Sequence, residues 1–223
     1  MPSTHSYTST PAHLTPTRPQ NHPLPPTPNP PSNTHPSSQI HNLLIKTPKI
    51  LIAAVNGPAP GWGTSSLALH DLVYTTPSAI FFTPFAQWGL CAEACSSYTF
   101  LATLGRQKAS ALILAGARMS AQELESAGLV TKIFDQQGEG AFMQEVMKVA
   151  RGMVKLPPKS LLFNKEIMMR GGLREELLRV NERELEALKG QVRGEESLGA
   201  IRGFKEETER KRREKAEKAK AKL

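Results

Sequence analysis

Cysteine and aromatic residues are scarce in this chain of 223 residues, and no hydrophobic run is long enough to cross a membrane. The two cysteines, Cys91 and Cys95, are four residues apart and have no histidine nearby, so we expect two reduced thiols, no disulfide framework and no metal site. The N-terminus lacks both the apolar core of a secretory signal and the Arg-rich amphipathic pattern of a mitochondrial one. We therefore expect neither a secreted disulfide-bonded protein nor a membrane-spanning one.

The positive charge of the chain is concentrated in its tail. The formal net charge is +8, and the last nineteen residues, "KEETERKRREKAEKAKAKL", carry nine Lys or Arg and five Glu, which is half of that excess. A run of mixed sign is typical of a solvated helix or a frayed tail, and no aromatic residues that could stack on bases are interleaved with it. We therefore expect no nucleic-acid partner.

The composition divides the chain into four parts. Residues 1–45 hold eleven of the eighteen prolines and five of the six histidines. Such a segment buries too little apolar surface to offset its ordering entropy, so we predict that it is disordered. Residues 46–156 are expected to form an α/β core and residues 157–204 a helical region, a size at which one hydrophobic core is sufficient. Residues 205–223 form the charged tail.

The first ordered segment is predicted to be a strand followed by a glycine-rich turn. "KILIAAVN" (49–56) is a nearly continuous apolar run, typical of a strand buried on both faces. "GPAPGWG" follows, and then a helix in "TSSLALHDL" that Thr64 or Ser65 could cap. This arrangement leaves backbone N–H groups free to face an anion, although a plain tight turn is an equally good interpretation. The spacing is neither a phosphate loop nor a dinucleotide fingerprint.

The rest of the chain alternates short strands with helices and then becomes helical. "DLVYTTPSAIFFTPF" predicts two short strands around a Thr-Thr-Pro-Ser turn, and "VTKIF" predicts another strand. A helix is predicted to end at Gly105, and Ser120 with Glu123 forms a capping box for a later one. Three longer helices follow, the first of them stopped by Pro157-Pro158. This order of elements is that of an α/β domain.

One carboxylate lies alone in a stretch that otherwise reads as buried. In "GLCAEACSSYTF" (89–100), Glu93 stands between Ala92 and Ala94, and the nearest basic side chain in the sequence is Arg106. From these residues alone, an exposed glutamate on a turn and a desolvated acid with a chemical role both remain open.

Taken in order, four segments resemble the enoyl-CoA hydratase/isomerase (crotonase) superfamily. They are "KILIAAVNGPAPGWG", "HDLVYTTPSAIFFTPFAQWGLCAEACSSYTF", "GRQKASALILAGARMSAQELESAGLV" and the "LPPKSLLFNKE" helix, which together span about residues 46–205. Within the superfamily they are most similar to the peroxisomal Δ3,Δ2-enoyl-CoA isomerase branch. The resemblance implies an α/β fold of repeated β-β-α turns that form a spiral, here truncated at its N-terminal side. It also implies a coenzyme A thioester as substrate, no further cofactor, and homo- or hetero-trimers formed through residues 157–204.

The chemistry of this branch gives Glu93 a role. Moving a double bond next to a thioester carbonyl takes a proton from C2 and returns one at C4, through an enolate whose oxygen needs preorganised donors. One carboxylate in an apolar pocket can carry both protons, and the pocket is expected to raise its pKa toward the working range. Glu93 matches the catalytic acid position, and the backbone N–H of Trp62 matches an oxyanion donor. The residues that the resemblance places in the substrate-binding site are Ala59, Gly61, Phe85 and Leu90.

Hydratase activity is disfavoured by two substitutions. The hydratase branch has two glutamates that activate water, and the corresponding positions here are Ser65 and Phe85, neither of which is a general base. The chain also has "GWG" in place of "GxS" or "GGG", and Ala94 where relatives more often have glycine. These departures alter the acyl pocket and the backbone next to Glu93.

The resemblance lacks its upstream part. The family's first oxyanion donor and much of its pocket for the coenzyme A nucleotide come from a "SxGxD"-type stretch upstream of Lys46, and residues 1–45 hold no such motif. Two strands of the spiral would then be missing, and apolar surface on "KILIAAVN" would be exposed. Either a partner covers that edge or the chain is a truncated or mis-spliced product. The alternative to an active isomerase is thus an impaired subunit that associates with full-length relatives.

Lys165 and the last three residues carry two further expectations. Lys165 could reach a coenzyme A phosphate across a subunit boundary, although a surface lysine is the better interpretation. Ala221-Lys222-Leu223 resembles the Ser-Lys-Leu address of peroxisomes, which implies an import receptor as partner and the peroxisome as location. His70 is expected to be a helix residue without a catalytic role, and Tyr98 and Phe100 are expected in the core.

Overall fold

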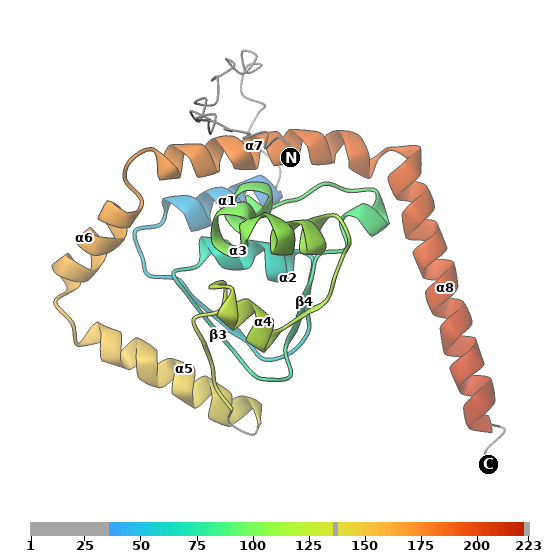
Figure 1. Cartoon of the computed structure of the whole chain (residues 1–223), viewed down its shortest axis with the longest axis horizontal. Coiled ribbons are helices and arrows are strands. Elements are labelled where there is room, and N and C mark those ends of the chain that lie inside the picture. The colour runs from blue at the N-terminus through green and yellow to red at the C-terminus, as the bar shows by residue number, and fades with distance from the viewer. Residues whose placement is uncertain (1–35, 136–137, 221–223) are drawn as a thin grey trace, which may run out of the picture. The chain divides into compact units, whose positions relative to one another are not determined.

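The computed structural model describes residues 36–135 and 138–220, all of which belong to the unit Thr34–Leu223. Strands lie in the first part of this unit and long helices in the second (Figure 1). In chain order the elements are α1 (Pro36–Lys46), β1 (Ile52–Val55), β2 (Ala59–Pro60), α2 (Trp62–Ser65), η1 (Ser66–Leu69), β3 (Leu72–Thr75), β4 (Ile80–Phe82), η2 (Ala86–Trp88), α3 (Ser96–Ile113), β5 (Met119–Ser120), α4 (Ala121–Ser126), β6 (Lys132–Ile133), α5 (Glu139–Val154), α6 (Pro158–Met168), α7 (Leu173–Val192) and α8 (Glu195–Lys220).

The strands form two three-stranded sheets. One has the order β1-β3-β6 and is parallel, with Ile52 opposite Leu72 and Tyr74 opposite Lys132. The other has the order β2-β4-β5, in which β2 is parallel and β5 antiparallel to β4. Both strands predicted around the Thr-Thr-Pro-Ser turn are present, but β3 and β4 belong to different sheets. The turn therefore passes the chain from one sheet to the other.

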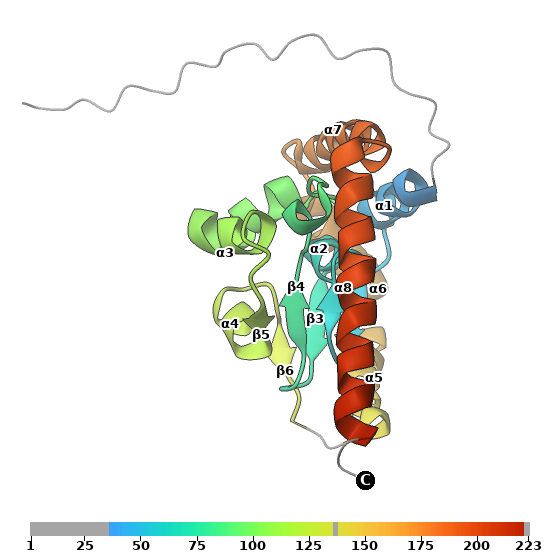
Figure 2. The same ribbon diagram turned by 90° about the vertical axis from the view of Figure 1, so that its right-hand side faces the viewer.

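The main hydrophobic core lies between the strands and the helices α3 and α4. It takes Val73 from β3, Phe81 from β4, Phe100 and Leu112 from α3, and Leu124 from α4, all of them buried. Figure 2 shows α3 and α4 on one side of these strands. Phe100 is thus in the core as predicted.

Tyr98, in contrast, is 38% exposed, so its predicted place in the core is wrong. It lies two residues before Phe100 on the same helix, and residues two apart on a helix face different directions, so the two rings cannot share one buried face.

Strand β1 is less buried than its composition predicts. Ile52, Ala53 and Val55 are half-buried and Ala54 is exposed, so this strand is not buried on both faces. The reason is its place at the edge of the sheet, where it pairs with β3 and with no second strand in the described part of the chain. This exposure agrees with the expectation that apolar surface on "KILIAAVN" would be exposed.

Helix α1 corrects the expectation of disorder across residues 1–45. Its residues from Pro36 onward form a helix, and the side chains of His41 and Ile45 are buried. α1 packs against α7, which covers it in Figure 1. The high proline content of the segment ends at Pro36, and the apolar spacing of Ile40, Leu44 and Ile45 after it allows one face of a helix to be buried. Residues 1–35 lie outside the described part.

The helix after the glycine turn begins earlier than expected. α2 starts at Trp62 with Gly61 as its N-cap at φ 53°, and no side chain caps it, so the prediction of a Thr64 or Ser65 cap is wrong. The Thr64 hydroxyl donates instead to the Ala59 carbonyl and accepts the Phe82 N–H at 3.2 Å. Thr64 thereby joins β2 to β4, and the positive φ that only Gly61 adopts easily opens the helix without a side-chain cap.

Other predicted helix ends are confirmed. Ser120 and Glu123 form the capping box of α4, with both reciprocal bonds present. α3 changes direction at Gly105, whose φ of 73° and ψ of 163° are not helical. Residues 205–220 continue α8 as helix, so the charged tail begins inside that helix. None of the helices in the described part has an apolar stretch that would span a lipid bilayer.

Candidate active site

Glu93 lies on the turn between η2 and α3. Its side chain is half-buried, and no hydrogen-bond donor to its carboxylate is present in the described residues. Burial raises the pKa of Glu93, and the negative charge of Glu184 raises it further. A carboxylate of this kind is a stronger proton acceptor than an exposed one.

The backbone that carries Glu93 is unusual. Ala94 and Cys95 have φ values of 55° and 62°, a left-handed conformation that residues other than glycine seldom adopt. Ala94 therefore has a backbone conformation that glycine adopts more easily. The turn is closed by the Ser96 hydroxyl and the Ser96 N–H, which both donate to the Glu93 carbonyl, at 2.7 and 3.1 Å.

Helix α7 supports this turn from the other side. The Glu184 carboxylate accepts the Cys95 N–H at 2.7 Å and the Ser97 N–H at 2.9 Å, and it is 6% exposed. The Cys91 N–H donates to the Gln191 side chain at 2.7 Å. The turn that bears Glu93 is thus tied at three backbone N–H groups to one helix.

The glycine turn supplies the second half of the predicted site. Gly61 donates its N–H to the Phe82 carbonyl at 2.8 Å, which fixes the turn against β4. The backbone N–H of Trp62 is at the first position of α2 and has no acceptor in the part of the chain that the structure describes. N–H groups of a first helical turn are left unpaired by the helix itself and suit an anion.

The Trp62 side chain is held by a buried histidine. Its indole N–H donates to His41 Nε2 at 2.9 Å, and His41 Nδ1 lies 2.8 Å from the Asn181 side-chain oxygen. Because Nε2 accepts, the proton of the neutral ring is on Nδ1, which donates to Asn181. Burial lowers the pKa of His41, and the hydrogen bond to Asn181 opposes this shift. The neutral ring keeps its hydrogen bonds to both Trp62 and Asn181.

One hydrophobic cluster joins the two halves of the site. It contains Ile45 from α1, Leu69 from the end of η1, Cys95 from the Glu93 turn, and Leu177 and Val180 from α7. The segment after the glycine turn and the turn that bears Glu93 therefore share one hydrophobic cluster with α1 and α7. Leu69, which follows Trp62 by seven residues, and Cys95, which follows Glu93 by two, thus belong to the same cluster.

The other predicted substrate-binding residues lie close to these elements. Ala59 is buried in β2, Phe85 is buried at the start of η2, and Leu90 is half-buried and donates its N–H to the Phe85 carbonyl at 2.9 Å. Ser65 and Phe85, at the positions of the two hydratase glutamates, are both buried. The Ser65 hydroxyl has no hydrogen-bond partner in the described residues.

Lys165 is not a surface residue. It is 7% exposed, and its ammonium donates to Asp71 Oδ2 at 2.7 Å and to the Lys49 carbonyl at 2.6 Å. The expectation of a surface lysine is therefore wrong, and its charge is already engaged within the chain. His70 follows η1 and contacts the Ser66 carbonyl through Nδ1 at 3.0 Å. The targeting residues Ala221, Lys222 and Leu223 lie outside the described residues.

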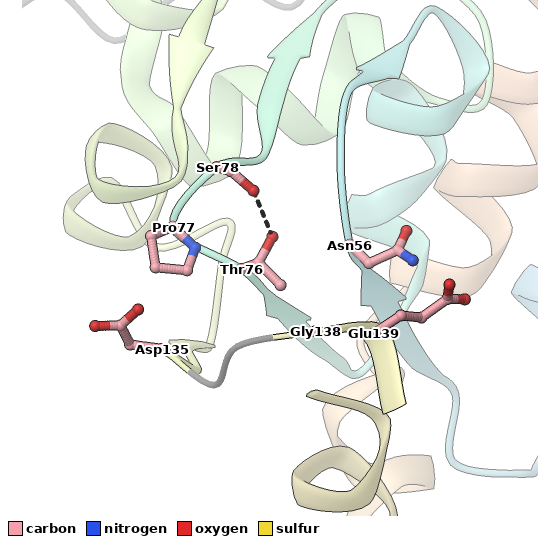
Figure 3. Close-up of a pocket in the computed structure, with 7 residues that line it drawn as sticks. All are labelled: Asn56, Thr76, Pro77, Ser78, Asp135, Gly138 and Glu139. Carbon is pink, nitrogen blue, oxygen red and sulfur yellow. Dashed lines mark hydrogen bonds between the residues drawn. The ribbon is translucent and has the colours of Figure 1, made fainter. Parts of the chain in front are cut away.

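A separate pocket lies at the ends of β1 and β3 (Figure 3). Its volume is about 310 Å³, and it is lined by Asn56, Thr76, Pro77, Ser78, Asp135, Gly138 and Glu139. None of the predicted site residues lines it, and the two carboxylates in its wall would repel the phosphates of coenzyme A. Within residues 36–135 and 138–220, no group of three or more His, Cys, Asp or Glu residues is placed to hold a metal ion.

Three residues of this region were not singled out from the sequence: His41, Asn181 and Glu184. A signal for two of them exists in α7, where Leu177, Val180, Asn181 and Glu184 follow the spacing of one helix face. Polar side chains on the apolar face of an amphipathic helix indicate a buried contact. Which partner they contact could not be read from that spacing.

Comparison with solved structures and families identifies the class of the protein. The fold is similar to the crystal structure of an enoyl-CoA hydratase/isomerase from Pseudoalteromonas atlantica T6c, with a TM-score of 0.71 and 33% identity over 76% of this chain and 68% of that one. The model of the enoyl-CoA hydratase/isomerase family matches residues 32–214. The chain belongs to this family and has its crotonase-like α/β fold, as the sequence motifs predicted.

The curated relatives include two kinds of enoyl-CoA delta isomerase. The chain is 41% identical to enoyl-CoA delta isomerase 2 of Rattus norvegicus over 163 aligned residues. These residues make up 73% of this chain and 41% of the rat protein. It is 37% identical to the peroxisomal enoyl-CoA delta isomerase 3 of Mus musculus over 163 aligned residues. These residues make up 73% of this chain and 50% of the mouse protein. The chain is thus related to enoyl-CoA delta isomerases and spans half of their length or less.

Proposed function

We propose that this protein is an enoyl-CoA isomerase that shifts the double bond of a 3-enoyl-CoA to the 2-position. The observation that carries the proposal is Glu93, a half-buried carboxylate at the family's acid position with a raised pKa. The relationship to enoyl-CoA delta isomerases supports the same reaction class. Ser65 and Phe85 supply no second carboxylate, which favours proton transfer over the addition of water.

In the proposed mechanism Glu93 moves one proton from C2 to C4. Its carboxylate takes a proton from C2 of the substrate, and the electron pair of that C–H bond delocalises over the double bond and the thioester as a dienolate. The Trp62 N–H donates to the developing oxyanion, and a donor of this type contributes about 3–4 kcal/mol. Glu93 then returns the proton to C4, which leaves the double bond between C2 and C3 and regenerates the carboxylate.

The substrate and the cellular setting are part of the proposal. The acyl chain of the coenzyme A thioester would lie against Ala59, Gly61, Phe85 and Leu90. The reaction would serve the β-oxidation of unsaturated fatty acids or a secondary-metabolite pathway. The protein would be imported into peroxisomes by a receptor that binds Ala221-Lys222-Leu223. It would assemble as homo- or hetero-trimers through residues 157–204.

The test is turnover of a 3-enoyl-CoA by the purified chain and by two variants. Glu93→Gln removes the proton carrier and keeps the size of the side chain, whereas Glu182→Gln changes one exposed glutamate on α7 and serves as the control. Loss of a general acid/base is expected to lower kcat by about 10²–10⁴-fold in Glu93→Gln, with no change in the control. A folded Glu93→Gln variant that turns over like the parent would contradict the role of Glu93.

The second candidate is a catalytically impaired subunit that associates with full-length relatives. The observation that favours it is the edge position of β1 and β2 in the two sheets, which leaves room for strands from another chain. Co-expression with a full-length relative would then yield mixed trimers on size-exclusion chromatography. A chain that elutes alone as a monomer in this experiment would count against the second candidate.

A further inference from the structure

A second carboxylate, that of Glu184, lies beside the turn that carries Glu93. It reaches the turn from the middle of α7, a part of the chain 87 and 89 residues away from the two groups that it binds. Its two oxygens are used separately, Oε2 by the Cys95 N–H at 2.7 Å and Oε1 by the Ser97 N–H at 2.9 Å. Glu184 thus caps the N-terminal end of α3 in place of a local side chain, since none caps it there.

The turn needs such a support. Ala94 and Cys95 both have positive φ, and residues other than glycine hold this conformation only where their surroundings fix it. Glu184 binds the N–H of Cys95 itself and that of Ser97, which lies just after it. Glu93 precedes this strained pair, so the direction of its side chain depends on the shape that Glu184 fixes.

Burial raises the pKa of Glu184 as well, but the groups around it oppose this shift. Two backbone N–H groups and the positive end of a helix face it, and Arg183 is the nearby cation. Glu93 has no donor in the described residues. The thiols of Cys91 and Cys95 also face the pair, and burial raises the pKa of both, so both thiols stay neutral. The charge that acts on Glu93 is therefore that of Glu184.

We propose that Glu184 is a positioning residue for Glu93, because its carboxylate binds two N–H groups of the turn at Cys95 and Ser97 and lies next to the base. This inference rests on the proposed function, in which Glu93 is the base. Under this inference, α7 holds the catalytic turn of its own chain through Glu184. The negative charge beside Glu93 disfavours its ionisation, which strengthens it as a proton acceptor.

Three variants separate the charge of Glu184 from its geometry. Glu184→Gln keeps one acceptor oxygen and loses the charge, Glu184→Asp keeps the charge and shortens the reach, and Glu186→Gln alters an exposed glutamate on the same helix as the control. Titration of the Glu93 side-chain carbon by NMR and the pH profile of kcat/KM are measured for each.

In Glu184→Gln we expect Glu93 to titrate at lower pH than in the parent. The rising limb of kcat/KM should move in the same direction, since the base must be deprotonated to act. Misplacement of the base should also lower kcat by about 10²-fold. Glu184→Asp should keep the parental titration and lose kcat, and Glu186→Gln should change neither.

An unchanged Glu93 titration and an unmoved pH profile in Glu184→Gln would overturn the inference. If Glu184→Gln does not fold, the NMR titration of Glu93 in the parent protein tests the inference instead. Two coupled carboxylates each show two titration steps, so a single step for Glu93 would overturn the inference. A parent without turnover that still shows the coupled titration refutes the proposed function alone. An active parent whose Glu184→Gln variant keeps the parental pH profile refutes this inference alone.

Discussion

Replacing Lys165 by methionine tests whether this buried lysine ties α6 to the edge of the first sheet. Its ammonium bonds Asp71 Oδ2 at 2.7 Å and the Lys49 carbonyl at 2.6 Å, and the same Asp71 oxygen accepts the Leu51 N–H at 2.7 Å. Methionine keeps most of the apolar stem of the side chain and removes every donor. Asp71 and the Lys49 carbonyl would then lose their charged partner at the segment that leads into β1.

The expected loss of stability follows from the burial of the two partners. Breaking a fully buried ion pair costs about 3–5 kcal/mol. The Lys165 side chain is 8% exposed but that of Asp71 is 24% exposed, so water can replace part of what Asp71 loses. We therefore expect Lys165→Met to lower the free energy of unfolding by about 2–3 kcal/mol, which corresponds to about 4–12 °C in Tm for a chain of this size.

Urea and thermal unfolding of Lys165→Met and of the control Lys159→Met, an exposed lysine on the same helix, provide the assay. A loss of stability in Lys165→Met but not in Lys159→Met would support the stabilising role of the contacts that Lys165 makes with Asp71 and Lys49. If Lys165 instead bound a coenzyme A phosphate, the variant would keep its stability and show a higher KM for acyl-CoA. Stability within about 0.5 kcal/mol of the parent would refute the reasoning.

Three further predictions concern the Glu93 turn and its neighbours. Gly89→Ala should lower stability by about 1–2 kcal/mol in thermal unfolding, because φ is 61° and the new Cβ would lie 3.0 Å from the Ser197 nitrogen. Cys95, buried and with its pKa raised to about 12, should resist iodoacetamide at about pH 8 until urea unfolds the chain, as mass spectrometry would show. Burial raises the pKa of Glu93 and Glu184, so the folded state keeps protons that the unfolded chain releases. Stability in urea should therefore fall as pH rises from the ordinary carboxyl range through the raised values, less so in Glu93→Gln.

Local sequence signals predicted much of the fold. The capping box at Ser120, the break of α3 at Gly105 and the strands around the Thr-Thr-Pro-Ser turn depend on neighbours in the chain, and all are present. The family motifs extended this to the superfamily fold, since they fix the order of elements that packing alone leaves open. The lone acid Glu93 could also be found from the sequence, because a single carboxylate among small apolar residues stands out.

Contacts between distant segments could not be predicted in the same way. The side chains of Asp71 and Lys165 are 94 residues apart, and those of His41 and Asn181 are 140 apart, so no spacing rule connects them. α1 was missed because its helical residues follow a proline-rich stretch whose composition dominated the window. Its burial comes from α7, which no local pattern assigns as its partner.

The contacts of α7 add a role within the chain to the assembly role predicted for the C-terminal helices. Residues 157–204 are predicted to serve assembly, and within the chain Glu184 of α7 contacts the Glu93 turn while Asn181, three residues before it, contacts His41. Asn181 acts on Trp62 through His41, and Glu184 acts on the turn of Glu93. In the proposed mechanism, one helix would therefore support both the Trp62 side chain, through His41, and the turn of Glu93. Any change that moves α7 should therefore affect both groups together.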